Sequence, residues 1–278
     1  YAHTIMLAGA ALEASSHESA TGWIEKLASG EAVVAFAYEE GAGTSTPDMI
    51  RTQATREGDG FTLTGEKRLV IAGAEADAIV VAARTGKDGP VGLYLVRQGA
   101  DGLATRSYTT IDGQSAAKIT FRGVAAEALL EDASEALEGI LTQAIIVQSA
   151  EAVGAMEALL AATTEYAMTR KQFGKPIMMF QSVAHRLSDM KMAYTKALST
   201  LTYTTALANS GAATARDISV LKGQIGILGR EIGEAAIQTH GGVGMTDELN
   251  ISHYHKRLLA YDAQLGDHAF HLRSIGQR

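Results

Sequence analysis

The pattern of hydrophobic and polar positions changes character twice along the chain. Residues 1–30 are rich in alanine, and their apolar residues recur at helical spacing. Residues 31–130 contain short apolar or alternating runs separated by breaks rich in Gly, Asp and Lys, which predict strands. Residues 131–278 carry long stretches of helical periodicity. We therefore predict the end of a helical domain, a middle β domain and a C-terminal helical bundle.

The individual elements follow from the same pattern. Four runs in the β segment predict short strands, and many short strands with turns between them favour a barrel or a sandwich. These runs are Phe61–Gly65, Ala76–Ala83, Val91–Val96 and Ala117–Phe121. The C-terminal segment contains four helical stretches, of which the second ends at a Ser-Gly pair and the third at a Gly-Gly pair. They are Glu135–Arg170, Phe180–Asn209, Arg216–His240 and roughly Asn250–Ile275.

Composition narrows the class of protein. With 46% hydrophobic and 20% charged residues among 278, the chain has the balance of a folded globular protein. Its net charge of −7 argues against a nucleic-acid partner, and the lack of cysteine excludes disulfides and thiolate catalysis. We find no apolar run long enough to cross a bilayer and no signal peptide after Tyr1, so we expect a cytoplasmic protein without a membrane partner. Because no methionine precedes Tyr1, we expect the natural chain to begin earlier.

Three glycine-containing motifs could bind a ligand. In Tyr38–Pro47 (YEEGAGTSTP), Gly41 and Gly43 permit close backbone approach, and the Thr and Ser residues offer hydroxyls. In Arg170–Ile177 (RKQFGKPI), the arginine could fork onto a phosphate and the phenylalanine could pack on an aromatic ring. In Gln238–Thr246 (QTHGGVGMT), backbone N–H groups could point at an anion. A polar loop, a helix end and a helix cap are the corresponding structural interpretations.

Histidines gather near the C-terminus, close to two aspartates. The residues are His253, His255, His268, His271, Asp262 and Asp267. His268 and His271 would share a helix face at a spacing that suits a metal, but local spacing places no third ligand. We therefore predict no metal site. The sequence also contains no nucleophile elbow, metalloprotease motif or P-loop.

In combination, the motifs resemble those of the acyl-CoA dehydrogenase family. RKQFGKPI is followed by Phe180 and Gln181 and later by QTHGGVG, as in that family. YEEGAGTS resembles the family's flavin-domain loop, and GEKRLVIAG, which begins at Gly65, resembles the strand after it. The resemblance covers nearly the whole chain and keeps the family's order. It implies an α+β multidomain fold with a middle β-barrel or sandwich domain and a C-terminal four-helix bundle, and with most of the N-terminal helical domain missing.

The resemblance also implies an activity and a cofactor. Enzymes of the family remove two hydrogens across Cα–Cβ of an acyl-CoA with a glutamate base and FAD, and they pass electrons to an electron-transferring flavoprotein. The second and third motifs reach across a subunit interface to the adenosine-pyrophosphate end of the neighbour's FAD. A guanidinium and a row of backbone amides suit a pyrophosphate. By this resemblance the cofactor-binding residues are Arg170, Gln172, Phe173, Phe180, Gln181, Gln238, Thr239, His240, Gly241 and Gly242.

The chain departs from the family where the catalytic base should lie. Counted from the third motif, the usual glutamate position is Leu265, and the alternative position on the first bundle helix is about Ala144. Neither side chain can accept a proton. Glu138 and Glu151 are the nearest carboxylates, but neither falls on the register. We therefore predict no catalytic residue in this chain.

The segments that hold the flavin ring in the family also differ here. Tyr38, Glu40 and Thr44 replace the family's threonine, proline and serine, while Leu69 and Ile71 replace its tryptophan and threonine. Without those groups, nitrogen and oxygen atoms of the ring would be poorly satisfied.

One half of the cofactor apparatus, the half that serves a neighbour, is therefore retained. We predict a subunit of a heteromeric α2β2 acyl-CoA dehydrogenase, in which a homologous partner subunit supplies the flavin-ring site and the catalytic glutamate. Paired enzymes of this kind act on steroid side-chain CoA thioesters in actinobacteria, and the resemblance points to that substrate class. Two alternatives stay open: a flavin-dependent monooxygenase of the same fold, with His268 near the vacant base position, and a non-catalytic scaffold.

Overall fold

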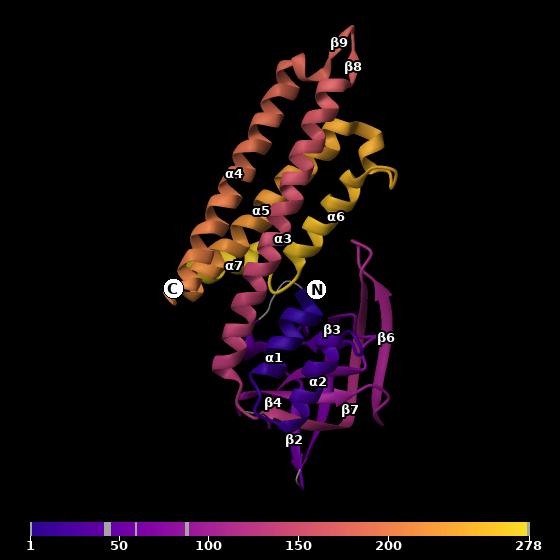
Figure 1. The fold of residues 1–278 in the computed structure, drawn as a ribbon, viewed down its shortest axis with the longest axis vertical. Coiled ribbons are helices and arrows are strands. Elements are labelled where there is room, and N and C mark those ends of the chain that lie inside the picture. The colour runs from indigo at the N-terminus through magenta and orange to yellow at the C-terminus, as the bar shows by residue number, and fades with distance from the viewer. Residues whose placement is uncertain (1, 42–45, 59, 87–88, 277–278) are drawn as a thin grey trace. The chain divides into compact units, whose positions relative to one another are not determined.

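The computed structural model describes residues 2–41, 46–58, 60–86 and 89–276 (Figure 1). It divides into two compact units, of which unit 1 spans residues 1–144 and unit 2 spans residues 145–278. The N-terminal helices and the barrel strands belong to unit 1, and the C-terminal helices belong to unit 2. The boundary falls inside a single long helix, α3 (Ser134–Thr169).

Unit 1 begins with helices, as the alanine-rich spacing predicts, and continues as a β barrel. A π-type helical segment, η1 (Ala2–Gly9), leads into α1 (Ala10–Glu13) and α2 (Glu18–Ser29). The pairings of β4 with β2, β2 with β3, β3 with β7, β7 with β5 and β5 with β4 close the strands into a ring. The described strands are β1 (Val34–Ala37), β2 (Gln53–Glu57), β3 (Gly60–Ile71), β4 (Ala78–Thr85), β5 (Val91–Arg97), β6 (Leu103–Thr109) and β7 (Ser115–Leu130).

All four predicted strands are present, and the structure adds strands that the pattern does not reveal. Strand β6 is exposed at nearly every position, and β2 buries only Ala54. A strand without an alternating buried face leaves no period-two signal in the sequence. Such strands are recognised only from the partner strand that they pair with.

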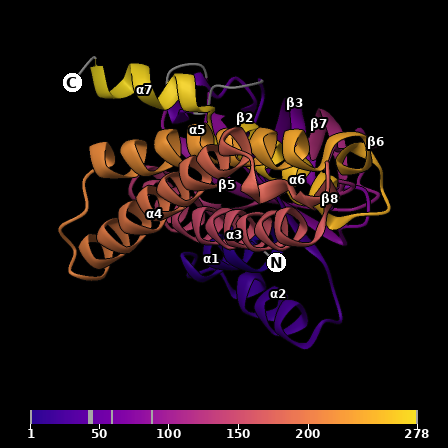
Figure 2. The same cartoon turned by 90° about the horizontal axis from the view of Figure 1, so that it is seen from above.

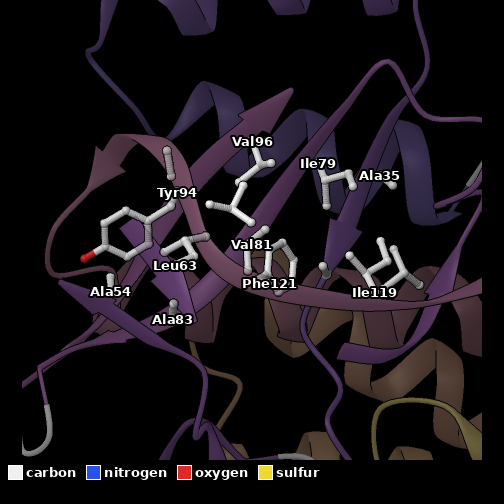
Figure 3. Close-up of a cluster of buried hydrophobic side chains, with 14 of the residues drawn as sticks. Ala35, Ala54, Leu63, Ile79, Val81, Ala83, Tyr94, Val96, Ile119 and Phe121 are labelled. Carbon is white, nitrogen blue, oxygen red and sulfur yellow. The ribbon is translucent and has the colours of Figure 1, made fainter. Parts of the chain in front are cut away.

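The inward-facing side chains of the barrel form the core of unit 1 (Figure 3). Leu63, Val81 and Phe121 point into this cluster from three different strands and are almost completely buried. The rings of Phe61 and Tyr94 lie 5.1 Å apart between centroids, and the Tyr94 hydroxyl hydrogen-bonds Oγ1 of Thr85 at 2.7 Å. Each large apolar side chain buried here contributes about 1.5–3 kcal/mol of stability.

Unit 2 is built from long helices joined by short turns (Figures 1 and 2). Helix α3 is followed by α4 (Gln181–Asn209) and α5 (Ala215–His240), so three predicted helices are confirmed to within one residue at each end. A capping box starts α5, because Thr214 and Asp217 bond each other's backbone N–H groups. Helix α5 packs against α4 and the two helices that follow it.

The fourth predicted helix is wrong in one respect, because Asn250–Ile275 is two helices. These are α6 (Asn250–Ala263) and α7 (His268–Gly276). Leu265 and Gly266 between them have φ angles of 52° and 85°, in the left-handed region where helices end. The break lies at the position where the family resemblance expects the base.

Helix α3 corrects the expectation about apolar length. It is long and apolar enough to cross a membrane by length and composition alone, the one such helix among the described residues. Half of its most apolar window is buried, as in the core helix of a bundle. One helix of this kind is weak evidence for a membrane span.

Gly226 of α5 makes room for the break between α6 and α7. A Cβ built on Gly226 would lie 2.3 Å from Oδ1 of Asp262. We expect Gly226→Ala to lower the free energy of unfolding by about 1–3 kcal/mol in urea denaturation. Gly154 of α3 is the matched control, since a Cβ there meets nothing within 4 Å. Gly154→Ala should instead raise the free energy of unfolding by about 0.5–1 kcal/mol. If both substitutions raised the free energy of unfolding by the same amount, the close contact between Gly226 and Asp262 would be contradicted.

Candidate functional site

The arginine predicted to bind phosphate lies where α3 gives way to a small hairpin. Strands β8 (Lys171–Gln172) and β9 (Lys175–Pro176) pair antiparallel beyond the ends of α3 and α4 (Figure 1). Phe173 in the turn has a φ of 51°, an uncommon value for a residue with a side chain. The Arg170 carbonyl accepts a hydrogen bond from the N–H of Ile177 at 2.8 Å, and the Arg170 side chain is exposed. The motif therefore ends α3 and leaves the guanidinium of Arg170 exposed to solvent.

An apolar surface surrounds the hairpin turn. Phe173 is 91% exposed, Met179 is 65% exposed and Met168 is 54% exposed. The rings of Phe173 and Phe180 meet edge to face at 6.1 Å, and Nζ of Lys175 lies 4.5 Å from the centre of the Phe180 ring. Exposed apolar groups gathered in one place are typical of a contact surface.

The glycine-rich motif ends α5 and divides into open and buried positions. Gly241 has a φ of 67°, which stops the helix, and the 3-10 turn η4 (Gly241–Met245) follows. Gln238 and both glycines at 241 and 242 are exposed. The Thr239 hydroxyl donates to the Ala235 carbonyl at 2.7 Å, and Nδ1 of His240 lies 2.9 Å from the Ala236 carbonyl oxygen. These two buried side chains are therefore bound to their own helix, although the resemblance places them among the cofactor contacts.

A ring stack brings the two motifs together at one end of unit 2. The rings of Tyr166 and His240 are 4.3 Å apart and 24° from parallel. Tyr166 lies one turn before Arg170, whose N–H donates to the Tyr166 carbonyl at 2.8 Å. We call this end the clamp, defined by its exposed polar members Arg170, Gln172, Gln181, Gln238, Gly241 and Gly242. One guanidinium and three amide side chains suit a ligand with phosphate oxygens, whereas the backbone N–H of Gly241 already donates to the Ile237 carbonyl at the end of α5.

Both predicted base positions hold buried apolar side chains. Leu265 is 4% exposed and Ala144 is 1% exposed. The Leu265 carbonyl oxygen lies 2.9 Å from Nε2 of His271. Glu151 forms a two-pronged ion pair with Arg257, with both N···O distances at 2.8 Å. The two predicted base positions, Leu265 and Ala144, therefore cannot supply a proton acceptor.

An Asp–His pair lies beside the Leu265 turn, and the sequence spacing did not predict it. Oδ2 of Asp262 is 2.7 Å from Nδ1 of His268, while Oδ1 accepts from the His268 backbone N–H at 2.9 Å. Nη2 of Arg230 is 3.8 Å from Oδ2. Across the described ranges, no group of three or more His, Asp or Glu side chains could hold a metal ion. The aspartate therefore orients an imidazole in this structure.

In unit 1, the loop that resembles the flavin-ring segment borders a cavity of about 410 Å³. Tyr38, Glu40 and Thr52 are among its lining residues. The motif residues at 42–45, including Thr44, lie outside the described residues. Leu69 is half-buried and Ile71 is buried, and neither side chain can form a hydrogen bond. These two strand positions thus lack the hydrogen-bonding groups that the family resemblance assigns to them.

Glu40 occupies the polar floor of this cavity. Its Oε1 accepts from Nζ of Lys67 at 2.8 Å, from the Thr52 hydroxyl at 2.6 Å and from the Thr52 N–H at 3.0 Å. Its Oε2 accepts from the Arg51 N–H at 2.7 Å. Nζ of Lys67 also donates to the Tyr38 carbonyl at 3.0 Å. Donors that could bind a ligand oxygen are therefore already used by one side chain of the protein.

This ion pair is charged at neutral pH. Burial would raise the pKa of Glu40, but the attraction of Lys67 and the hydrogen bonds from Lys67 and Thr52 hold the pKa below 4.5. Complete burial lowers the pKa of Lys67 to about 8, although the attraction of Glu40 opposes that shift. A buried cation of this kind depends on its carboxylate.

Comparison with known proteins places this geometry in a family context. The acyl-CoA dehydrogenase C-terminal domain model matches residues 134–278, and the middle domain model matches residues 35–124. Acyl-CoA dehydrogenase FadE27 of Mycobacterium tuberculosis is 28% identical over 98% of this chain and 74% of its own length.

Solved structures agree with the family models. The Tcur3481-Tcur3483 steroid ACAD is 26% identical, with a TM-score of 0.89 over 99% of this chain and 74% of that one. The FAD complex of PigA is 25% identical, with a TM-score of 0.88 over 99% of this chain and 75% of that one. The chain thus spans 74–75% of the length of these relatives.

Proposed function

The chain belongs to the acyl-CoA dehydrogenase family, and from that premise we propose that it is one subunit of a heteromeric, FAD-dependent acyl-CoA dehydrogenase. In this proposal the clamp holds the adenosine-pyrophosphate end of an FAD. A homologous partner subunit supplies the flavin-ring site, the catalytic glutamate and the acyl-CoA pocket. The electrons leave through an electron-transferring flavoprotein, as the family resemblance implies.

One contrast carries the proposal. The polar side chains of the clamp are exposed, whereas the base position is apolar and the hydrogen-bond donors at the flavin-ring position are already bonded. The side chain of Arg170 and the amide side chains of Gln172 and Gln238 are exposed, which fits a pyrophosphate. Leu265 is buried and apolar, and the donors near the first motif are bound to Glu40. The residues of this chain therefore fit the phosphate end of FAD and do not fit its ring.

The family cofactor would supply the hydride-accepting ring, and the clamp residues would supply only position and charge. The guanidinium of Arg170 would neutralise phosphate charge, and the exposed side-chain amides of the three clamp glutamines would donate hydrogen bonds to phosphate oxygens. Apolar groups around Phe173 would exclude water from the contact with the partner subunit. The cofactor in the PigA complex supports FAD as the ligand.

A steroid side-chain CoA thioester is the proposed substrate class. This substrate class is supported by the similarity of the chain to the Tcur3481-Tcur3483 steroid ACAD. The family resemblance of the motifs points the same way.

Purification of the chain from its native source tests the proposed assembly. We expect a homologous dehydrogenase subunit to copurify, with about one FAD for each pair of chains and activity only in the complex. A homo-oligomer with one FAD per chain and dehydrogenase activity would overturn the proposal. A colourless complex without released flavin would favour the scaffold alternative instead.

A flavin-dependent monooxygenase is a second candidate, and the Asp262–His268 pair favours it. The carboxylate 2.7 Å from Nδ1 fixes the imidazole orientation and leaves Nε2 to accept a proton. Such an enzyme needs no base for an α proton. The chain alone, supplied with reduced flavin, oxygen and an acyl-CoA, would then transfer one oxygen atom to the acyl-CoA and reduce the other to water, and His268→Ala would abolish the oxygenated product. No turnover under these conditions would exclude this candidate.

A further inference from the structure

A row of glycines on α5 faces ionisable side chains of α6 and α7. A side chain at these glycines would collide with or touch the facing residue, so the helices approach one another closely. We call the contact the histidine seam. Its pairs, with the distance from a Cβ built on the glycine, are Gly233 with Nδ1 of His255 (2.1 Å), Gly226 with Oδ1 of Asp262 (2.3 Å) and Gly223 with Cβ of His271 (3.5 Å).

Two histidines of the seam carry a buried ring nitrogen without a partner. Within the described part of the chain, Nδ1 of His255 and Nδ1 of His271 are buried and make no hydrogen bond. Nε2 of His271 is 2.9 Å from the Leu265 carbonyl oxygen, which can only accept. The proton of neutral His271 therefore lies on Nε2. A second proton would have to enter at Nδ1, where no acceptor receives it.

The charged groups that face His271 lie on α5, on α6 and in the turn after α6. Lys222 on α5 opposes a positive charge there, while Asp262 on α6 and Asp267 in the following turn favour one. Nζ of Lys222 is fixed, because it donates to the carbonyls of Tyr261 and Asp262 at 2.9 and 3.1 Å. Burial has the largest effect and lowers the pKa of His271 below 6.5.

The pKa of His255 is set by burial and by nearby charges in the same way. Both charged groups that face it lie on α5, where Glu234 favours a positive charge and Arg230 opposes it. Burial again has the largest effect and lowers the pKa of His255 below 6.5. The unfolded chain therefore binds these protons more readily than the folded chain. The stability that neutral histidines give is complete above about pH 6.5 and is lost as the pH falls toward the folded pKa.

We propose that the histidine seam is a pH-sensitive latch, in which protonation of His255 and His271 loosens α6 and α7 from α5. Gly233 packs closely against the ring of His255, and the bond to the Leu265 carbonyl holds the ring of His271, so both imidazolium rings are kept from turning toward a new acceptor. Loosening relieves the buried charge by admitting water to both Nδ1 atoms. The Leu265 turn moves with the latch, because the bond from His271 to the Leu265 carbonyl holds it. The inference is independent of the proposed cofactor role.

Hydrogen exchange with mass spectrometry on the full chain tests the latch. Between pH 7.5 and pH 5.0, after correction for intrinsic exchange, we expect the protection of α7 to fall about tenfold or more. Helix α4 serves as the internal reference and should keep its protection. Unchanged α7 protection would overturn the proposal, and so would a parallel loss in α4, which would indicate global unfolding.

Variants separate the titrating groups from simple loss of packing. In the double variant His255→Gln and His271→Gln, the amide at 271 can still donate to the Leu265 carbonyl but cannot titrate. We expect α7 to stay protected at pH 5.0 in this variant, whereas His185→Gln on the exposed face of α4 should leave the opening intact. In the wild type, the opening midpoint should match the titration of His255 and His271 seen by NMR. A mismatch, or opening in the double variant, would refute the latch.

Discussion

Replacing Lys67 with methionine is expected to lower the free energy of unfolding by about 3–5 kcal/mol. The side chain of Lys67 is completely buried, and the side chain of Glu40, its ion-pair partner, is 16% exposed. Removing the cation leaves a carboxylate held by the Arg51 and Thr52 N–H groups with its charge uncompensated. Urea denaturation followed by circular dichroism would measure the loss as a lower midpoint.

Two further variants show whether the loss comes from the buried charge. Arg68→Met removes the neighbouring surface cation, which pairs with Glu66 at 3.0 Å and is 64% exposed. That change should cost no more than about 1 kcal/mol. Combining Glu40→Gln with Lys67→Met should recover part of the stability, because no buried charge is then left alone. If the double variant is less stable than Lys67→Met, the charge explanation fails.

Replacing Arg170 with glutamine is expected to weaken FAD binding in the assembled enzyme about 10- to 100-fold. A hydrogen bond to a charged group contributes about 1.5–3 kcal/mol, and Arg170 is the arginine of the clamp. FAD retained after gel filtration, together with calorimetric titration of the stripped complex, would measure the change. Lower affinity should also lower the melting temperature at a fixed FAD concentration.

Lys171 provides the matched control for Arg170. It is the next residue, it is exposed, and it belongs to strand β8 of the hairpin. Lys171→Gln removes the same charge from the same hairpin, so a general electrostatic effect would appear in both variants. Equal FAD affinity in the two variants would rule out a specific contact from Arg170. Unchanged affinity in both would remove the clamp from the proposed function.

The helices of unit 2 were predictable because their apolar periodicity is long and their ends carry strong signals. Thr214 and Asp217 at the start of α5 and Gly241 at its end fix its limits through local geometry alone. The break at Leu265 was not predictable, since leucine rarely adopts a left-handed φ. Tertiary bonds hold that turn, including the one from His271, and a local pattern does not contain them.

The candidate site was predicted more completely in its location than in its chemistry. The second and third motifs named the residues that meet at the clamp, but they did not distinguish Thr239 and His240, which turn toward their own helix. Helical spacing carries that information, since Ala236, Thr239 and His240 share one buried face of α5. From the sequence, Glu40 was interpreted only as the loss of the family's proline, because its ion-pair partner Lys67 becomes a neighbour only through the fold.

The position of the boundary between the units has a consequence for cutting the polypeptide. The division at residues 144 and 145 falls within α3, so no loop joins unit 1 to unit 2. A protease that needs an extended, exposed segment finds none at that point. A fragment starting at Ile145 would lose about three turns of its first helix. Recombination between relatives should therefore exchange the helix whole, with crossovers before Ser134 or after Thr169.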